Sequence, residues 1–211
     1  MKKRVLAVFC SLALTAASAC AAGLDELTVF LKNTTSATGE FSQTVKDAQG
    51  REDAQAAGQG RFAFLRPGCF SWHYAAPFEE RMVSDGKTLW LYDTELAQVT
   101  VKKLTAALPA SPASLLFGQN DFTKDFNVKN LPSKDDLAWV IATPKDSASA
   151  FSEVRIAFHK NLPREMTLKD NFGQETRLVF KNVQTNVKLN KNQFTFKIPT
   201  GVDVLEDKSG L

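Results

Sequence analysis

Histidine and cysteine, two side chains well suited to acid–base and nucleophilic chemistry near neutral pH, are both rare in this sequence. The chain has 2 His and 3 Cys. His73 falls on the polar face of a predicted strand, and His159 ends another strand beside Lys160. The motifs H-E-x-x-H, C-x-x-C and G-x-S-x-G are absent. The sequence therefore favours a protein that is not an enzyme and holds no metal ion. A secreted hydrolase without a partnered histidine stays open, but no residue can be nominated for it.

Arg66 is a charged residue in an unusual place, because it continues an apolar row. Phe62 and Phe64 alternate along a predicted strand, and the same period puts Arg66 on their face. Pro67 follows, so one interpretation is that the strand has ended and Arg66 meets solvent; parity alone slightly favours it. An inward guanidinium would instead need hydrogen-bond partners. It could bind backbone carbonyls of a facing loop or helix as a latch, at about 1.5–3 kcal/mol per hydrogen bond.

Alternating apolar and polar residues dominate the elements that would position these side chains. A short amphipathic helix over 24–31 comes first, and Asp85-Gly86 and Asn171–Gly173 are typical of hairpin turns. The expected strands are 40–45, 61–64, 70–74, 81–84, 87–92, 97–102, 122–128, 137–143, 153–159, 164–169 and 175–181. About ten or eleven strands predict a mainly β (α+β) protein, built as a barrel or a large curved antiparallel sheet.

A second short helix is predicted between the two halves of the chain. Ser111 can cap it and Pro112 suits its first position. Leu115, Leu116 and Phe117 then make it very apolar. We expect this segment to pack on the sheet without joining it.

Phenylalanine is unusually abundant: the chain has 16 Phe against 2 Tyr and 3 Trp. Each large aromatic buries roughly 150–250 Å². A well-filled core explains much of this content. A sheet curved around an apolar cavity would also be rich in Phe, and such a cavity would suit an acyl chain, whose buried methylenes are each worth about 0.8 kcal/mol.

The excess of basic residues is confined to the N-terminus. Residues 2–4 are basic, 5–14 are apolar, and Ala19-Cys20-Ala21 is an A-x-A site, so residues 1–21 form a predicted cleavable signal peptide. Cleavage after residue 21, or one residue later, leaves a single domain of residues 22–211. The whole chain has 26 Lys and Arg against 23 Asp and Glu, so removing three basic residues leaves 23 of each. A formally neutral chain with no basic stripe argues against a nucleic-acid partner.

Lipidation is the alternative fate of this N-terminus. Ala17–Cys20 resembles a degenerate bacterial lipobox, which would leave Cys20 acylated. Such boxes usually carry Leu where Ala17 stands, so soluble export is favoured. Cys69 is then the only remaining thiol, which rules out an intramolecular disulfide in the processed chain. We expect it to be a small buried hydrophobe.

Three stretches resemble the periplasmic outer-membrane lipoprotein carrier proteins, the LolA family. Phe41-Ser42-Gln43 resembles the F-x-Q of the family's first strand. Gly58-x-Gly60 leading to 66–72 resembles its G-x-G…R-P-x-x-F-x-W signature, and 83–92 resembles its V-S-D-G-K-x-L-W-x-Y hairpin at every defined position. The ending Phe196…Pro199-x-Gly201-Val202 is a weaker match.

The resemblance implies an incomplete antiparallel β-barrel, with short helices covering a hydrophobic cavity and no cofactor. It implies a periplasmic, monomeric chaperone that binds the acyl chains of lipoproteins released by an inner-membrane ABC transporter. The chaperone delivers these lipoproteins to an outer-membrane receptor of similar fold. The residues carried over are the latch Arg66, the aromatics Phe41, Phe70, Trp72 and Trp90, and the lid residues Leu115, Leu116 and Phe117; Phe62 and Phe64 join them from the apolar row.

Two relatives of the same fold remain as alternatives. One is a lipid-anchored outer-membrane lipoprotein receptor, against which the poor lipobox argues. The other is a module that senses lipoproteins without carrying them. The intact mass of the processed protein would distinguish the anchored form.

Overall fold

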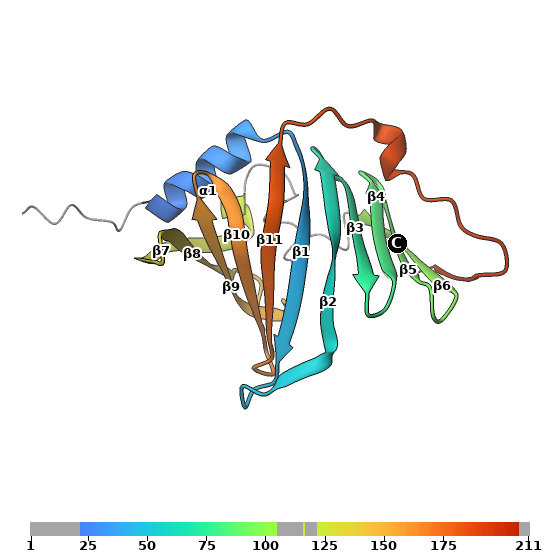
Figure 1. Cartoon of the computed structure of the whole chain (residues 1–211), viewed down its shortest axis with the longest axis horizontal. Coiled ribbons are helices and arrows are strands. Elements are labelled where there is room, and N and C mark those ends of the chain that lie inside the picture. Colours follow the sequence, from blue (N-terminus) through green and yellow to red (C-terminus); the bar gives the residue numbers. More distant parts are fainter. Residues whose placement is uncertain (1–21, 105–115, 117–121, 207–211) are drawn as a thin grey trace, which may run out of the picture.

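The computed structural model describes residues 22–104, 116 and 122–206. Within these residues, twelve strands form one sheet in the order β12-β6-β5-β4-β3-β2-β1-β11-β10-β9-β8-β7 (Figure 1). The strands are β1 (Ser36–Lys46), β2 (Glu52–Leu65), β3 (Cys69–Ala76), β4 (Glu80–Asp85), β5 (Thr88–Asp93), β6 (Gln98–Lys103), β7 (Phe126–Lys134), β8 (Leu137–Pro144), β9 (Phe151–His159), β10 (Leu162–Asp170), β11 (Glu175–Thr185) and β12 (Asp203–Glu206). The sheet is curved and open between β12 and β7, so the predicted mainly β class and incomplete barrel are confirmed.

Two details of the predicted strands are corrected by the structure. The strand expected over 122–128 lies at Phe126–Lys134, and Phe122–Lys124 forms a 3-10 helix instead. Pro132 lies inside β7, which an edge strand tolerates because one of its sides makes no ladder hydrogen bonds. β12 was not anticipated, and it pairs in parallel with β6.

The hairpin predicted at Asp85-Gly86 forms as expected. Asp85 Oδ1 accepts hydrogen bonds from the backbone N–H groups of Lys87 and Thr88, both at 2.8 Å. Gly86 has φ +95°, which suits a residue without Cβ. The turn keeps β4 and β5 in register, with Ser84 opposite Leu89.

Helix α1 (Ala22–Asn33) covers one end of the sheet and packs on β7, β8 and β9 (Figure 1). Its residues Leu27, Phe30 and Leu31 are buried, as its apolar face predicted. Gly23 lies so close to the Trp139 backbone that a Cβ would collide with it, which explains a small residue near the start of the helix. We call the side of the sheet that faces α1 the inner face.

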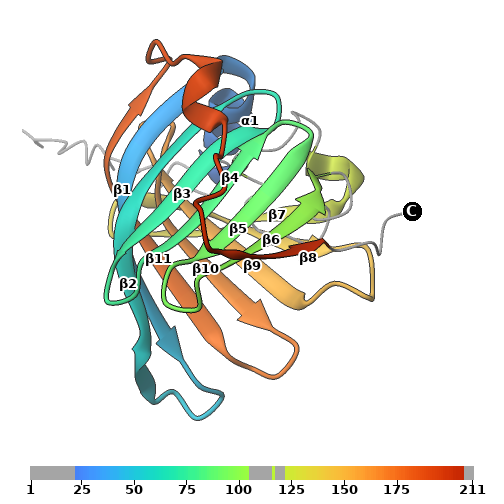
Figure 2. The same cartoon turned by 90° about the vertical axis from the view of Figure 1, so that its right-hand side faces the viewer.

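The C-terminal segment covers part of the other side, the outer face (Figure 2). The 3-10 helix η2 (Lys191–Phe194) contacts β3 and β4. A capping box joins Asn190 and Gln193 at its start, and Phe194 is fully buried. The chain then leads to β12 at the sheet edge.

The predicted signal peptide at 1–21 lies outside the described residues. So does the predicted helix at 111–117, apart from Leu116. Among the helices that the structure describes, none has the length and apolar character of a membrane span.

Candidate functional site

Aromatic side chains gather on the inner face of β1, β2, β3 and β11. Phe41 stacks on Trp72 with ring centroids 4.1 Å apart, and Phe62 stacks on the same indole at 5.7 Å. Phe180 meets Phe62 edge to face at 5.7 Å. Strand register explains the grouping, because Phe62 lies opposite Trp72 and Phe41 lies opposite Phe180. Two of the predicted site residues, Phe41 and Phe62, therefore both stack on a third, Trp72.

The same apolar interior continues towards α1. Phe64 lies opposite Phe70 in the β2–β3 pair, and both are buried. The Phe64 ring meets Phe30 of α1 edge to face at 6.3 Å, and Phe30 lies 6.1 Å from Phe158. Phe64 and Phe70 are thus placed beside the helix rather than at the centre of the stacked cluster.

Arg66 points inward, so the solvent-facing interpretation of its position is wrong. Its Nε donates to the carbonyl of Thr34 at 2.9 Å, and its Nη2 donates to the carbonyl of Leu116 at 2.6 Å. The guanidinium carbon lies 5.1 Å from the Phe64 ring centroid and 5.9 Å from that of Phe30, within cation–π range. The strand ends here, but the two carbonyls supply the partners that an inward charge needs.

Burial lowers the pKa of Arg66 to about 10, because desolvation disfavours the charged form. The side chain nevertheless carries its charge at neutral pH. A half-buried cation above an apolar interior costs free energy unless its hydrogen bonds are made, so these two contacts determine where the guanidinium rests.

Asn186 positions one of these two carbonyls, and sequence reasoning missed it. It follows β11, and its side chain donates to the carbonyl of Asn33 at 2.9 Å and accepts from the N–H of Thr35 at 2.9 Å. Those residues flank Thr34, whose carbonyl faces Arg66. No local pattern could reveal a contact between residues 151 apart in the sequence.

Leu116 is the described part of the predicted lid. Its side chain is 2 % exposed and belongs to the same buried cluster as Phe64 and Trp72. Leu116 thus joins the cluster through its side chain and joins Arg66 through its carbonyl. The other two predicted lid residues, Leu115 and Phe117, lie outside the described residues.

Trp90 lies apart from the cluster, which corrects the expectation that it lines the cavity. Its neighbours Leu89 and Leu91 pack in the inner-face cluster, and alternation along β5 sends Trp90 to the outer face. There its ring lies 6.3 Å from Phe196 of the C-terminal segment, and Tyr92 lies 5.6 Å from the same ring. The parity of Leu89-Trp90-Leu91 could have shown this from the sequence.

Tyr74 is a further member of the inner-face cluster that the predicted site did not include. Its ring meets Phe41 edge to face at 4.9 Å. Its hydroxyl donates to Gln43 Oε1 at 2.9 Å, and Gln43 Nε2 donates to the Ala56 carbonyl at 3.0 Å. Burial raises the pKa of Tyr74 to about 12. Its two-residue spacing from Trp72 was the available signal.

The two histidines make structural contacts, and Cys69 is buried. His73 Nε2 lies 3.1 Å from Glu79, which also accepts from Arg81 at 2.6 Å. His159 Nδ1 lies 3.0 Å from the Asp136 carbonyl. Cys69 is buried, and burial raises the pKa of its thiol, so it is not an activated nucleophile. In the described residues no group of three His, Cys, Asp or Glu could hold a metal ion.

Comparison with known proteins identifies the family of this chain. The family described as outer membrane lipoprotein carrier protein LolA matches residues 32–197. An outer-membrane lipoprotein carrier protein of Bordetella avium is 45 % identical over 202 residues, which span 95 % of this chain and 96 % of that protein. The protein of the same name from Cupriavidus pinatubonensis is 42 % identical over 211 residues, 98 % of this chain and 100 % of that one.

Solved structures show the same fold at low sequence identity. An uncharacterized conserved protein from Thermus thermophilus has a TM-score of 0.54 at 11 % identity, covering 87 % of this chain and 96 % of its own. A LolA superfamily protein from Nitrosomonas europaea has a TM-score of 0.50 at 13 % identity, covering 82 % and 96 %. By the extent and identity of its sequence matches, this chain belongs to the LolA family of outer membrane lipoprotein carrier proteins.

Proposed function

We propose that this protein is a periplasmic chaperone that carries lipoproteins by burying their acyl chains against the inner-face aromatic cluster. The observation that supports it best is the position of Arg66, whose guanidinium joins the carbonyls of Thr34 and Leu116 above apolar rings. A charge so placed can hold two segments together over an apolar interior. The identity of the cargo is inferred from the names of its relatives, which are outer-membrane lipoprotein carrier proteins.

The free energies of these contacts allow acyl chains to be loaded and released without a nucleotide. Each hydrogen bond from the charged donor is worth about 1.5–3 kcal/mol, and each buried methylene is worth about 0.8 kcal/mol. Two to four methylenes therefore offset one Arg66 hydrogen bond. An acyl chain can displace the Arg66 contacts, and their re-formation helps to expel the chain.

The remaining parts of the proposal rest on sequence and family. Residues 1–21 direct export and are removed, which leaves residues 22–211 as one domain that works as a monomer. An inner-membrane ABC transporter supplies the lipoprotein, and an outer-membrane receptor accepts it. The acyl-binding site and its lid comprise Arg66, Phe41, Phe62, Phe64, Phe70, Trp72, Leu115, Leu116 and Phe117.

Capture of acylated lipoproteins from spheroplasts by the purified protein tests the proposal. We expect the wild-type protein to release them into the supernatant. Phe70→Glu should impair uptake or hand-over, because it adds a buried carboxylate beside Phe64. Ser71→Glu is the matched control, since alternation places the adjacent residue of β3 on the outer face.

The possible outcomes separate the carrier function from the role of Phe70. No release by the wild-type protein would refute the carrier function. Equal release and hand-over by the wild type, Phe70→Glu and Ser71→Glu would remove Phe70 from the site. The intact mass of the processed protein would show whether a lipid remains at Cys20, as the receptor alternative requires.

A further inference from the structure

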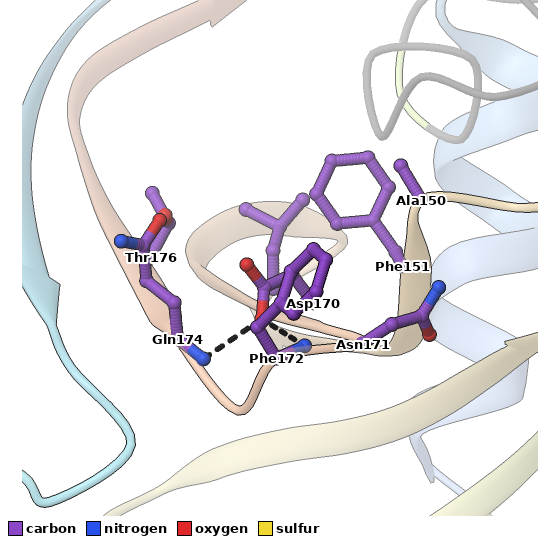
Figure 3. Close-up of a pocket in the computed structure, with 8 residues that line it drawn as sticks. Ala150, Phe151, Asp170, Asn171, Phe172, Gln174 and Thr176 are labelled. Atoms are coloured by element: carbon purple, nitrogen blue, oxygen red, sulfur yellow. Dashed lines mark hydrogen bonds between the residues drawn. The ribbon is translucent and has the colours of Figure 1, made fainter.

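An apolar pocket of about 300 Å³ lies beside the turn between β10 and β11 (Figure 3), at the end of the sheet away from α1 (Figure 1). Its walls are formed by Phe151 of β9, Leu168 of β10 and Thr176 of β11, and residues of the turn 170–174 between β10 and β11 line its mouth. Arg66 lies at the opposite end, because it follows the top of β2 beside the end of α1. The proposed latch and this pocket therefore occupy opposite ends of the inner face.

The pocket borders the apolar interior through two of its wall residues. Leu168 is 5 % exposed and belongs to the same buried cluster as Trp72 and Phe180, and Phe151 packs against that cluster. Leu168 lies opposite Thr176 in the β10–β11 pair, so both side chains are on the inner face. The inner wall of the pocket is thus one end of the buried cluster.

The polar groups at the mouth of the pocket make hydrogen bonds to the backbone of two turns. Asp170 Oδ1 accepts from the backbone N–H groups of Phe172 and Gln174, both at 2.8 Å (Figure 3). Asn171 Nδ2 donates to the carbonyl of Ser149 at 2.7 Å. The Asp170 bonds stabilise the β10–β11 turn, and the Asn171 bond fastens it to the loop before β9. Since the walls themselves are apolar, the pocket suits a ligand that needs no hydrogen bond.

Phe172 stands at this mouth and is 90 % exposed. The turn does not require an aromatic residue there, because Asp170 and Gly173 provide its geometry. An exposed phenyl ring beside an apolar opening offers contact area to a ligand that reaches the mouth.

We propose that this pocket receives the terminal methylenes of a long acyl chain that passes through the inner-face cluster, so that the pocket sets the preferred chain length. The inference rests on the proposed function, because it assumes that the interior holds acyl chains. A chain too short to reach the pocket gains nothing from it. Each methylene that the pocket buries raises affinity by about fourfold.

The test measures binding of synthetic triacylated cysteinyl peptides carrying either dodecanoyl or hexadecanoyl chains. We expect the wild-type protein to bind the hexadecanoyl peptide at least about tenfold more tightly. Thr176→Trp fills the pocket and should reduce this ratio to within about threefold, while affinity for the dodecanoyl peptide stays within about twofold. Thr44→Trp is the matched control: it makes the same substitution on neighbouring β1, at an exposed position next to Val45, the residue that pairs with Thr176.

Phe172→Ser provides a second variant at a position that the fold leaves exposed. It should lower affinity for the hexadecanoyl peptide several-fold and leave the dodecanoyl peptide unaffected. Binding of neither peptide by the wild type would refute the proposed function itself. Binding of both peptides, with an unchanged chain-length ratio in Thr176→Trp and Phe172→Ser, would refute the pocket alone.

Discussion

Replacing Arg66 by leucine should separate the stability of the protein from its ability to release cargo. The variant loses the hydrogen bonds to the carbonyls of Thr34 and Leu116. At about 1.5–3 kcal/mol each, these two bonds give about 3–6 kcal/mol to the closed arrangement. The leucine side chain also removes a desolvated charge, which offsets much of the loss in folding free energy. We therefore expect the midpoint of urea unfolding to change little.

The effect on acyl binding should be larger. In the proposed mechanism, the Arg66 bonds compete with the ligand, because the lid contacts must yield when acyl chains enter. Removing about 3 kcal/mol of competition strengthens binding by about a hundredfold, at 1.4 kcal/mol per factor of ten. Uptake should persist in Arg66→Leu, and hand-over to receptor-containing membranes should slow by a similar factor.

The assay titrates a triacylated peptide into each variant and then follows its transfer to outer-membrane vesicles. Arg61→Leu is the control, since Arg61 is an exposed arginine on the same strand. Arg66→Lys keeps the charge without the forked donors, so it should fall between wild type and leucine. Unchanged affinity and transfer in Arg66→Leu would refute the latch, whatever its urea midpoint.

Two further predictions concern stability. Tyr74→Phe removes the donor to Gln43 Oε1 and should lower the free energy of unfolding, measured in urea, by about 1–3 kcal/mol. Tyr92→Phe on the outer face is the control and should change that free energy by less than about 0.5 kcal/mol. Equal losses in the two variants would contradict a stabilising role for the Tyr74–Gln43 hydrogen bond. Hydrogen bonds from Arg81 and then from His73 lower the pKa of Glu79 below 4.5, so its stabilising contribution is present above pH 4.5 and disappears as the pH falls through the folded-state pKa. The midpoint of urea unfolding should therefore fall less between pH 7 and pH 3 in Glu79→Gln than in the wild type. Equal decreases would contradict a stabilising contribution from the Glu79 carboxylate and its partners Arg81 and His73.

Local periodicity was enough to predict most of the sheet. Strands such as β3 and β5 alternate cleanly, and the Asp85-Gly86 turn has one favoured geometry, so residue type and position determine the structure there. The same alternation was sufficient to place Trp90 on the outer face. The family-based assignment to the cavity overrode that signal and was wrong.

Contacts between distant segments could not be predicted in the same way. The C-terminal segment alternates at Phe194, Phe196 and Ile198 as a strand would, yet it forms the 3-10 helix η2 and then irregular structure. The burial of Phe194 depends on a sheet surface contributed by strands far away in the sequence. Parity put Arg66 on the right face but could not supply its partners, the carbonyls of Thr34 and Leu116. Asn186 escaped notice for the same reason, since a side chain that orders a distant turn has no local signature.

The position of β1 between β2 and β11 also bears on how the chain acquires its structure. Glu40 and Asn182, which are hydrogen-bonded across this junction, lie 142 residues apart in sequence. The first strand to be synthesised therefore lacks one of its two neighbours until almost the whole polypeptide has emerged. Such long-range pairing makes folding slow, because a large loop must close before its contacts are gained. In the export that we propose for this chain, slow folding would keep the polypeptide extended during translocation.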